Sequence, residues 1–271
     1  MRMKRQYIYQ IYYDDVTRGG IDPQFLPLDN VRNERPDWRE YWPMRNFLLN
    51  NALDEDAHYG FFSPKFGLKT GLSGKTVAEF IDANDADVYL FTPFVEQASF
   101  FLNPFEHGEA NHPGLMAAAQ QFVAALGVQV DLRMLVCDYN TTVYSNYFVA
   151  RPAFWRKWLQ WGESLFAMAE AGEAPLSAAL NATADYHQQV GAVAQKVFIM
   201  ERLVTLVLLF NQFSTKAFDP FAITRCGISA SYLDHEMRVA NALKMAFLNT
   251  RDNRYVESFM QFRNAVMASL R

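Results

Sequence analysis

The run Tyr7–Tyr13, Tyr-Ile-Tyr-Gln-Ile-Tyr-Tyr, constrains the fold most, because it is aromatic and β-branched and leads directly into Asp14 and Asp15. Such side chains are enriched in strands, and the Asp-Asp-Val-Thr-Arg-Gly-Gly stretch that follows is rich in turn-forming residues. We therefore expect an N-terminal strand. In open α/β sheets, ligands bind outside the carboxyl ends of the strands, so the two aspartates either contact a ligand or only begin a turn.

The rest of the first half alternates between strand and helix patterns. Residues 87–93 have a continuous apolar centre, as in a strand buried on both faces, and residues 128–136 alternate strictly between apolar and polar side chains. Residues 64–74 and 106–112 are expected to be loops. The expected strands or extended segments are 25–30, 59–63, 87–93, 128–136 and 144–150, and the expected helices are 37–51, 76–84, 113–126 and 152–161.

After residue 151 nearly all of the pattern is helical, with apolar stripes such as Met237, Ala240, Leu243 and Phe247. The run Val197–Phe210 is a turn or two too short to span a bilayer, so it predicts a buried helix. These patterns predict an α/β fold whose sheet is flanked by helices, with a helical C-terminal part. The expected division is a ligand-binding domain at 1–215, with C-terminal helices at 216–271 packed on the same domain.

Composition excludes several classes of protein. Apolar residues make up 51% of the chain, which argues against disorder, and a net charge of −4 argues against a nucleic-acid partner. Gln6 and Gln10 interrupt the N-terminal apolar run, so we expect no signal peptide. Cys137 and Cys226 lack metal-site spacing and fit reduced, buried thiols of a cytoplasmic protein. Contact with a membrane surface and the oligomeric state remain open.

Lys65, Lys69 and Lys75 lie in or beside a glycine-rich segment, where backbone N–H groups and lysines can contact phosphate. The segment is not a Walker motif, because Lys69 occupies the position of the required first glycine. The alternative is a plain solvated loop.

The segment Glu106-His107-Gly108-Glu109-Ala110-Asn111-His112 holds four potential ligands within seven residues. It could hold a divalent metal, bind sugar hydroxyls through Glu109 and His112, or cap the next helix. The spacing does not match HExxH, so the sequence leaves these interpretations open.

Glu201 and Arg202 interrupt an otherwise apolar helix, where charged groups are costly unless they are partnered or border a cleft. Glu201 is therefore either half of an ion pair with another element or a general base at the edge of a pocket.

Asn146 lies among amide and hydroxyl side chains before an aromatic strand, a composition that suits sugar recognition or a turn. Neither GxSxG nor GxGxxG is present in the required context.

Taken in order, several stretches resemble the GT-A-type glycosyltransferases of bacterial polysaccharide and lipopolysaccharide synthesis, including the uncharacterised glycosyltransferase-like families of such loci. The matching stretches lie within roughly residues 7–210 and are Ile8–Asp14, Phe25–Asn30, Tyr59–Ser63, Tyr144–Ala150 and Val197–Leu203. The resemblance implies a GT-A-like, Rossmann-like mixed sheet and a cytoplasmic enzyme. Such an enzyme transfers a sugar from a nucleotide-sugar donor to a glycan or glycolipid acceptor.

The resemblance also assigns roles to residues. Gln10, Tyr13 and Asp14 would contact the nucleotide, Asn146 would face the sugar or acceptor, and Glu201 would deprotonate the acceptor hydroxyl. The family's Asp-x-Asp motif, which binds Mn²⁺ or Mg²⁺, should follow a central strand, but here residues 88–91 are followed by Thr-Pro-Phe. This departure leaves metal dependence and catalytic competence open.

A metal-free enzyme would need Lys65, Lys69 or a helix N-terminus to stabilise the departing diphosphate. Two alternative functions also remain. One is a non-catalytic relative that binds carbohydrate or a partner protein, and the other is a metal-dependent hydrolase centred on residues 106–112.

Overall fold

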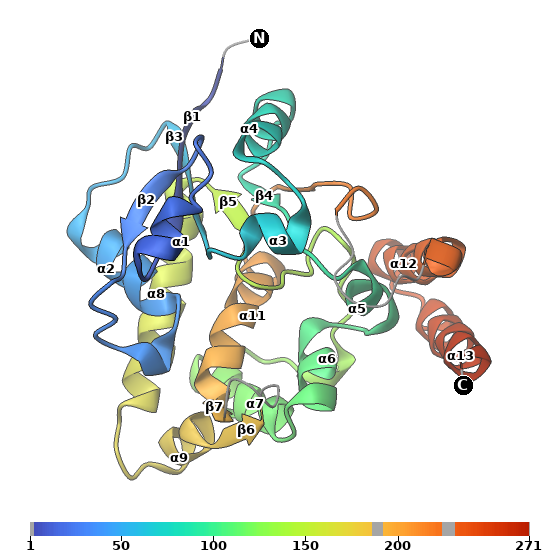
Figure 1. Cartoon of the computed structure of the whole chain (residues 1–271). Helices are drawn as coiled ribbons and strands as arrows, with labels where there is room; N and C mark the ends of the chain where they lie inside the picture. Colours follow the sequence, from blue (N-terminus) through green and yellow to red (C-terminus); the bar gives the residue numbers. More distant parts are fainter. Residues whose placement is uncertain (1–2, 186–191, 224–230, 271) are drawn as a thin grey trace.

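The computed structural model describes residues 3–185, 192–223 and 231–270, and it is built around a six-stranded mixed sheet flanked by helices (Figure 1). The strand order is β2-β1-β3-β5-β4-β8. These strands are β1 (Arg5–Tyr12), β2 (Leu26–Asp29), β3 (Ala57–Phe62), β4 (Val88–Leu90), β5 (Phe148–Ala150) and β8 (Thr215–Ala217). The expected α/β class with a mixed sheet is confirmed.

Strand β5 is antiparallel to both of its neighbours, whereas β1 is parallel to β2 and β3, and β4 is parallel to β8. The start of β5 therefore lies at the same edge of the sheet as the carboxyl ends of the other five strands. This carboxyl edge is the part of an α/β sheet where ligands bind.

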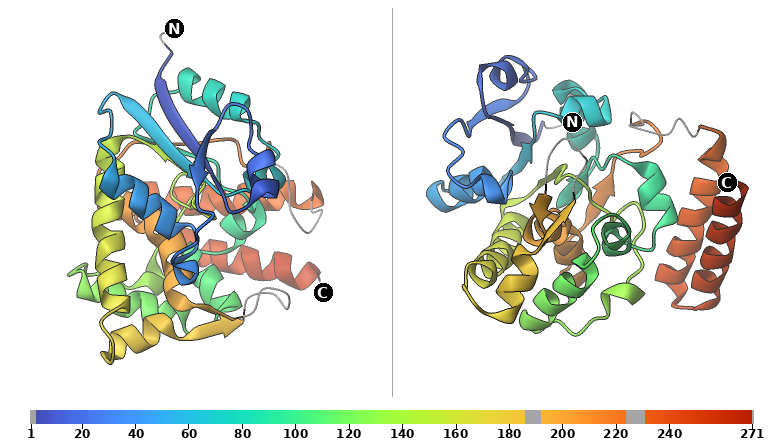
Figure 2. Two further views of the ribbon diagram at one scale, coloured as in Figure 1. Left: turned by 60° about the vertical axis from the view of Figure 1, so that its left-hand side comes forward. Right: turned by 60° about the horizontal axis from the view of Figure 1, so that its bottom comes forward.

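Helices cover both faces of the sheet, as the two further views show (Figure 2). The α-helices of the first half are α1 (Asp15–Gly19), α2 (Tyr41–Asn50), α3 (Phe66–Thr70), α4 (Gly74–Ala83), α5 (Val95–Phe100), α6 (Pro104–Asn111) and α7 (Leu115–Ala125). Those of the second half are α8 (Pro152–Ala169), α9 (Pro175–Asn181), α11 (Gln195–Phe210), α12 (Asp234–Thr250) and α13 (Arg254–Ser269). Single 3₁₀ turns are η1 (Pro36–Trp38), η2 (Leu132–Met134) and η3 (Ser231–Leu233).

Alternating side chains divide the core between the two faces. In β4, Val88 and Leu90 pack with α7, α8 and α11 on one face, whereas Tyr89 packs with α3 and α4 on the other. The largest cluster includes the indole of Trp155 on α8, which donates a hydrogen bond to the carbonyl of Tyr59 in β3 over 2.9 Å. Cys137 is buried and free, whereas Cys226 lies outside the described residues.

The expected strand at 128–136 is wrong, since the segment contains only the η2 turn. Side chains satisfy its backbone instead of a neighbouring strand. The Gln120 amide bonds the Val130 carbonyl (2.7 Å) and the Leu132 N–H (2.9 Å), while Asn103 donates to the carbonyls of Leu132 and Leu135 (3.0 and 2.8 Å). The alternating pattern predicted a strand because sequence alone does not show these distant amides.

The expected all-helical second half is also only partly correct. Strands β6 (Thr183–Asp185) and β7 (Ala192–Ala194) form a separate antiparallel pair, and β8 joins the main sheet beside β4. The expected division between residues 215 and 216 falls inside β8. Helices α12 and α13 lie side by side in both views and pack with α5 through a third apolar cluster (Figures 1 and 2).

Replacing Gly60 with alanine should destabilise the sheet, because an added Cβ would lie 2.7 Å from Cγ2 of Val149 on the paired strand β5. We expect Gly60→Ala to lower the free energy of unfolding by about 1–3 kcal/mol, as measured by urea denaturation. Gly67→Ala is the matched control, since its Cβ would meet nothing closer than 3.9 Å. Equal stability of the two variants would contradict the β3–β5 packing.

Candidate functional site

The carboxyl edge of the sheet gathers polar and aromatic side chains from separate parts of the chain. Ser63, just after β3, shares a 2.7 Å hydrogen bond with the hydroxyl of Tyr147, just before β5. Lys69 on α3 donates to Oγ of Ser145 over 2.9 Å, and its ammonium group lies over the rings of Tyr147 and Phe94 at 5.8 and 5.6 Å. The antiparallel strand β5 therefore brings the segment 145–147 against α3 and the end of β4.

Unusual backbone conformations concentrate around this edge. Phe94, Ser145 and Asn146 have φ angles of 67°, 61° and 55°, in the left-handed region that non-glycine residues rarely adopt. Arg39 has φ 50° and ψ −134°, which is also costly for a residue with a Cβ atom. Such conformations persist only where surrounding structure enforces them, and they cluster at functional sites.

Glu201 is half-buried, and it is the one residue of α11 from Gln195 to Leu208 that is not fully covered. Within the described residues its carboxylate accepts no hydrogen bond, although it belongs to an otherwise apolar helix. Burial raises the pKa of Glu201; the nearby carboxylate of Glu40 raises it further, whereas the charges of Arg202, Lys69 and Arg39 oppose the rise. A partly exposed carboxylate of raised pKa has the properties of a general base.

The segment that precedes β5 runs beside Glu201. The Val143 N–H donates to Oγ1 of Thr205 over 3.2 Å, and Thr205 lies one helical turn after Glu201 on the same face of α11. Lys69 of α3 and Arg39, which precedes α2, also lie within electrostatic range of the Glu201 carboxylate.

Arg202, the neighbour of Glu201, turns to a different part of the molecule. It is buried, its Nε donates to the carbonyl of Pro104 over 2.7 Å, and its Nη1 donates to the carbonyl of Phe198 over 2.8 Å. The hydrogen bond to Pro104 therefore links α11 to α6. Among the described residues Glu201 forms no ion pair, so the ion-pair interpretation from the sequence finds no support here.

The expected nucleotide contacts at the end of β1 differ in their surroundings. Tyr13 is half-buried and lies within charge range of Glu40, Arg39 and Tyr147, and burial strongly raises its pKa. Asp14 is exposed and caps α1, its Oδ1 accepting from the N–H and the hydroxyl of Thr17 at 2.7 Å each. The turn interpretation of Asp14 thus holds, while its second oxygen is not used by the cap.

Two further expected donor residues lie at the borders of this group. Gln10 is buried, its Oε1 accepts from the Asp22 N–H over 2.9 Å, and its amide approaches the carbonyls of Ser63 and Pro64 at 3.5 Å. Gln10 therefore links β1 to the segments that contain Asp22 and Ser63. Lys65 is exposed and precedes α3, a short helix inside the segment that was expected to be a loop.

The expected loop at 106–112 is wrong, because residues 104–111 form α6. Asn103 caps this helix by accepting from the N–H groups of Phe105 and Glu106 at 2.9 and 3.0 Å, and Pro104 occupies its first position. The Asn103-Pro104 pair is a helix-start signal in the sequence, whereas Gly108 and Pro113-Gly114 suggest a loop.

The potential metal ligands within residues 106–112 each make separate structural contacts. Glu106 pairs with Arg263 at 2.8 Å, and Glu109 accepts from the N–H groups of Gly114 and Met116 at the start of α7, at 3.1 and 2.7 Å. His112 stacks on Phe198 with ring centroids 3.7 Å apart. Of the three interpretations from sequence, the geometry gives Glu109 the helix-capping one.

The residues near the sheet do not fit a divalent metal. Across residues 3–185, 192–223 and 231–270 no group of three or more histidine, cysteine or acidic side chains is arranged to hold an ion. Thr92, Pro93 and Phe94 follow β4, whereas Asp87 lies at the opposite end of that strand and accepts from the Ser214 N–H over 2.9 Å. We therefore derive no chemical step through Mn²⁺ or Mg²⁺.

Sequence reasoning missed Arg39 and Asn30. Arg39 follows an unremarkable polar stretch, and only its backbone angles and its effect on Glu201 identify it. Asn30 follows β2, its side chain is buried, and its amide nitrogen has no hydrogen-bond partner among the described residues. The turn after Leu-Pro-Leu-Asp was the available signal, since it marks a strand end at the same edge.

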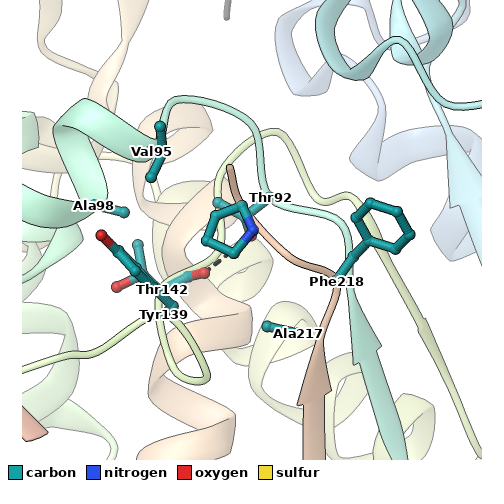
Figure 3. A pocket seen from close by; sticks show the side chains of 8 residues that line it. Thr92, Val95, Ala98, Tyr139, Thr142, Ala217 and Phe218 are labelled. Atoms are coloured by element: carbon teal, nitrogen blue, oxygen red, sulfur yellow. Dashed lines mark hydrogen bonds between the residues drawn. The ribbon is translucent and has the colours of Figure 1, made fainter. Parts of the chain in front are cut away.

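At the far side of the carboxyl edge, a narrow pocket lies between the ends of β4 and β8. Figure 3 shows Thr92, Thr142 and Ala217 around it, with the Thr92 hydroxyl donating to the Thr142 carbonyl over 2.9 Å. Tyr139 and Pro220 also line this pocket.

No family model, curated protein or solved structure matches the chain. Among the described residues, no helix combines the length and apolar character needed to cross a membrane. The site is therefore characterised by its own geometry.

His107 provides a test of the α6 geometry. Its ring lies against those of Phe101 and Tyr144, and burial lowers its pKa from 6.5 to about 3. Below pH 6.5 the His107 side chain therefore binds a proton in the unfolded chain but not in the folded protein. The free energy of unfolding should fall as the pH drops below 6.5, by at most about 1.4 kcal/mol per pH unit.

His107→Phe keeps a ring in place and should weaken this dependence, measured by urea denaturation at about pH 7 and about pH 5. His235→Phe, at an exposed position of α12, is the control and should behave as the unaltered protein does. An unchanged pH dependence in His107→Phe would show that His107 is not a buried neutral side chain.

Proposed function

We propose that the protein transfers a sugar from a nucleotide-sugar donor to a hydroxyl group of a glycan or glycolipid, with Glu201 as the general base. The observation that supports this proposal most is that α11 is buried from Gln195 to Leu208 except at Glu201. Its carboxylate lies within electrostatic range of Lys69 and Arg39. A carboxylate beside two cations suits a reaction that removes a proton at one point and releases an anion at another.

The donor would bind along the carboxyl edge. The Tyr13 ring offers a surface for a base, while the second Asp14 oxygen and the Asn30 amide offer an acceptor and a donor for ribose or base atoms. Lys69 and Arg39 would hold the diphosphate, and Asn146, whose buried Oδ1 has no partner among the described residues, would accept from a sugar hydroxyl.

In the chemical step the acceptor oxygen forms a bond to the anomeric carbon as the bond from that carbon to the diphosphate oxygen breaks. Glu201 takes the acceptor's proton, and the electron pair of the broken bond stays with the nucleoside diphosphate. Lys69 and Arg39 supply positive charge where the negative charge develops, which a site without carboxylate metal ligands requires.

Two further features support this class of enzyme. A mixed sheet with one reversed strand between β3 and β4 is compatible with the GT-A architecture that the sequence resembles. That resemblance also places the reaction in cell-surface polysaccharide or lipopolysaccharide synthesis. The missing Asp-x-Asp motif is the observation that favours the second candidate, a non-catalytic relative that binds carbohydrate.

A nucleoside diphosphate such as UDP or GDP should raise the melting temperature, because ligand that binds only the folded state stabilises it. Lys69→Met should weaken that binding about tenfold, since it removes a charged hydrogen-bond donor. Lys75→Met is the control, because the Lys75 side chain is 77% exposed on α4 and only faces Glu79. The donor site is wrong if no nucleotide shifts the melting temperature, or if both variants behave alike.

Glu201→Gln should reduce the rate of sugar transfer by about 10²–10⁴-fold and leave the nucleotide-induced melting shift intact. Glu79→Gln, at an exposed position of α4, should change neither quantity. Transfer would be followed as release of nucleoside diphosphate in the presence of acceptor. Full activity of Glu201→Gln would remove Glu201 as the base, and binding of nucleotide sugars without any transfer by the unaltered protein would favour the non-catalytic alternative.

A further inference from the structure

A cavity of about 300 Å³ lies between α12 and the segment that follows β8. Ligand sites in proteins span about 300–1,000 Å³, so this cavity has room for a small ring compound. Its walls come from three distant parts of the chain and are formed by Tyr139, residues 219–221, and Arg238, Asn241, Ala242 and Met245 of α12.

The cavity holds one cation and one carboxylate that do not neutralise each other. The Arg238 guanidinium lies 3.7 Å from the centroid of the Phe221 ring and forms no ion pair within the described residues. Oδ1 of Asp219 accepts from the Phe221 N–H at 3.0 Å, and the other carboxylate oxygen is not used by this contact. A stacked guanidinium keeps its N–H groups at the edge, where they can donate.

The wall formed by Tyr139 and Asn241 is held by hydrogen bonds within the protein. Asn241 is buried and its Oδ1 accepts from the Tyr139 N–H over 3.1 Å, while the Tyr139 hydroxyl bonds the carbonyl of Met237 at 3.1 Å and the hydroxyl of Ser99 at 2.7 Å. Ala242 and Met245 add apolar surface on the same helix. The cavity thus combines a rigid aromatic and apolar wall with separated donors and acceptors.

This combination matches an uncharged sugar residue. Sugar hydroxyls both donate and accept, so they can satisfy Asp219 and Arg238 together, whereas the C–H groups of the ring suit the apolar wall. An anion would meet Arg238 but would also face the Asp219 carboxylate in the same cavity.

The cavity adjoins a second pocket at the carboxyl edge of the sheet. Tyr139 and Pro220 line both this cavity and the narrow pocket of Figure 3, which reaches Thr92 and Thr142 at the carboxyl edge. The same chain segment then continues to Ser145, which accepts from Lys69. The segment 139–147 therefore has the cavity at its start and the groups around Glu201 at its end.

We propose that this cavity is an acceptor subsite that holds one uncharged sugar residue of the glycan, with Arg238 and Asp219 bound to its hydroxyls. The assignment as an acceptor subsite rests on the proposed function. Binding of the sugar itself does not depend on transfer, so the two can fail separately.

The test is a titration, followed by ligand-observed NMR, with maltotriose, cellotriose and chitotriose as uncharged probes and digalacturonic acid as the anionic probe. At least one uncharged probe should bind, and Arg238→Gln should weaken it about tenfold, because donors on a charged group are lost. Arg251→Gln is the control, since Arg251 is also exposed, caps the C-terminal end of α12, and lies over the Phe247 ring at 5.9 Å outside the cavity.

Binding of an uncharged probe that Arg238→Gln weakens and Arg251→Gln does not would support the proposal. Absence of binding by all three uncharged probes, binding of digalacturonic acid alone, or equal weakening by both variants would overturn it. A melting shift with UDP or GDP in the same preparation shows whether the donor site is intact, so a failure here is distinguishable from a failure of the proposed function.

Discussion

The burial of α11 is the constraint on which the rest of the structure depends. This helix packs against α7, α8 and α9 in the largest apolar cluster, and its side chains are covered from Gln195 to Leu208 except at Glu201. A carboxylate in such surroundings loses hydration that nothing in the helix replaces, which is why its pKa rises. The fold tolerates this cost at one position. The cations that lessen it are the neighbouring Arg202 and, from elements far away in sequence, Lys69 and Arg39.

A second ionic group holds those elements in place. Lys196, buried at the start of α11, lies 2.8 Å from Asp37 in η1. Arg35 bridges Asp37 and Glu170, the residue directly after α8, at 2.9 and 2.7 Å. The hydrogen bond from Arg35, followed by that from Lys196, lowers the pKa of Asp37 to about 2. This network ties α8, α11 and η1 together immediately before Arg39, and so helps to enforce the costly backbone angles at that residue.

The architecture was largely readable from local patterns, whereas the site was not. The N-terminal strand, the doubly buried strand around Tyr89 and the buried helix of α11 are each specified by short apolar patterns, and all are present. The alternating pattern of residues 128–136 wrongly predicted a strand, because amide side chains elsewhere in the chain form the hydrogen bonds of its backbone. Asp14 and Glu109 both cap helices, a role that the sequence had left open beside ligand binding. Arg39 could not have been found, since its relation to Glu201 arises only when η1 and α11 pack together.

The central claim is that a nucleoside diphosphate binds beside the Glu201 carboxylate. It is tested most directly by titrating the ¹³C-labelled glutamate carboxylates by NMR, with the Glu201→Gln variant used to assign the Glu201 signal. Because a bound diphosphate is a like charge, it should raise the pKa of Glu201 above its already raised value in the free protein. A Glu201 titration that is the same with and without saturating nucleotide would contradict the account.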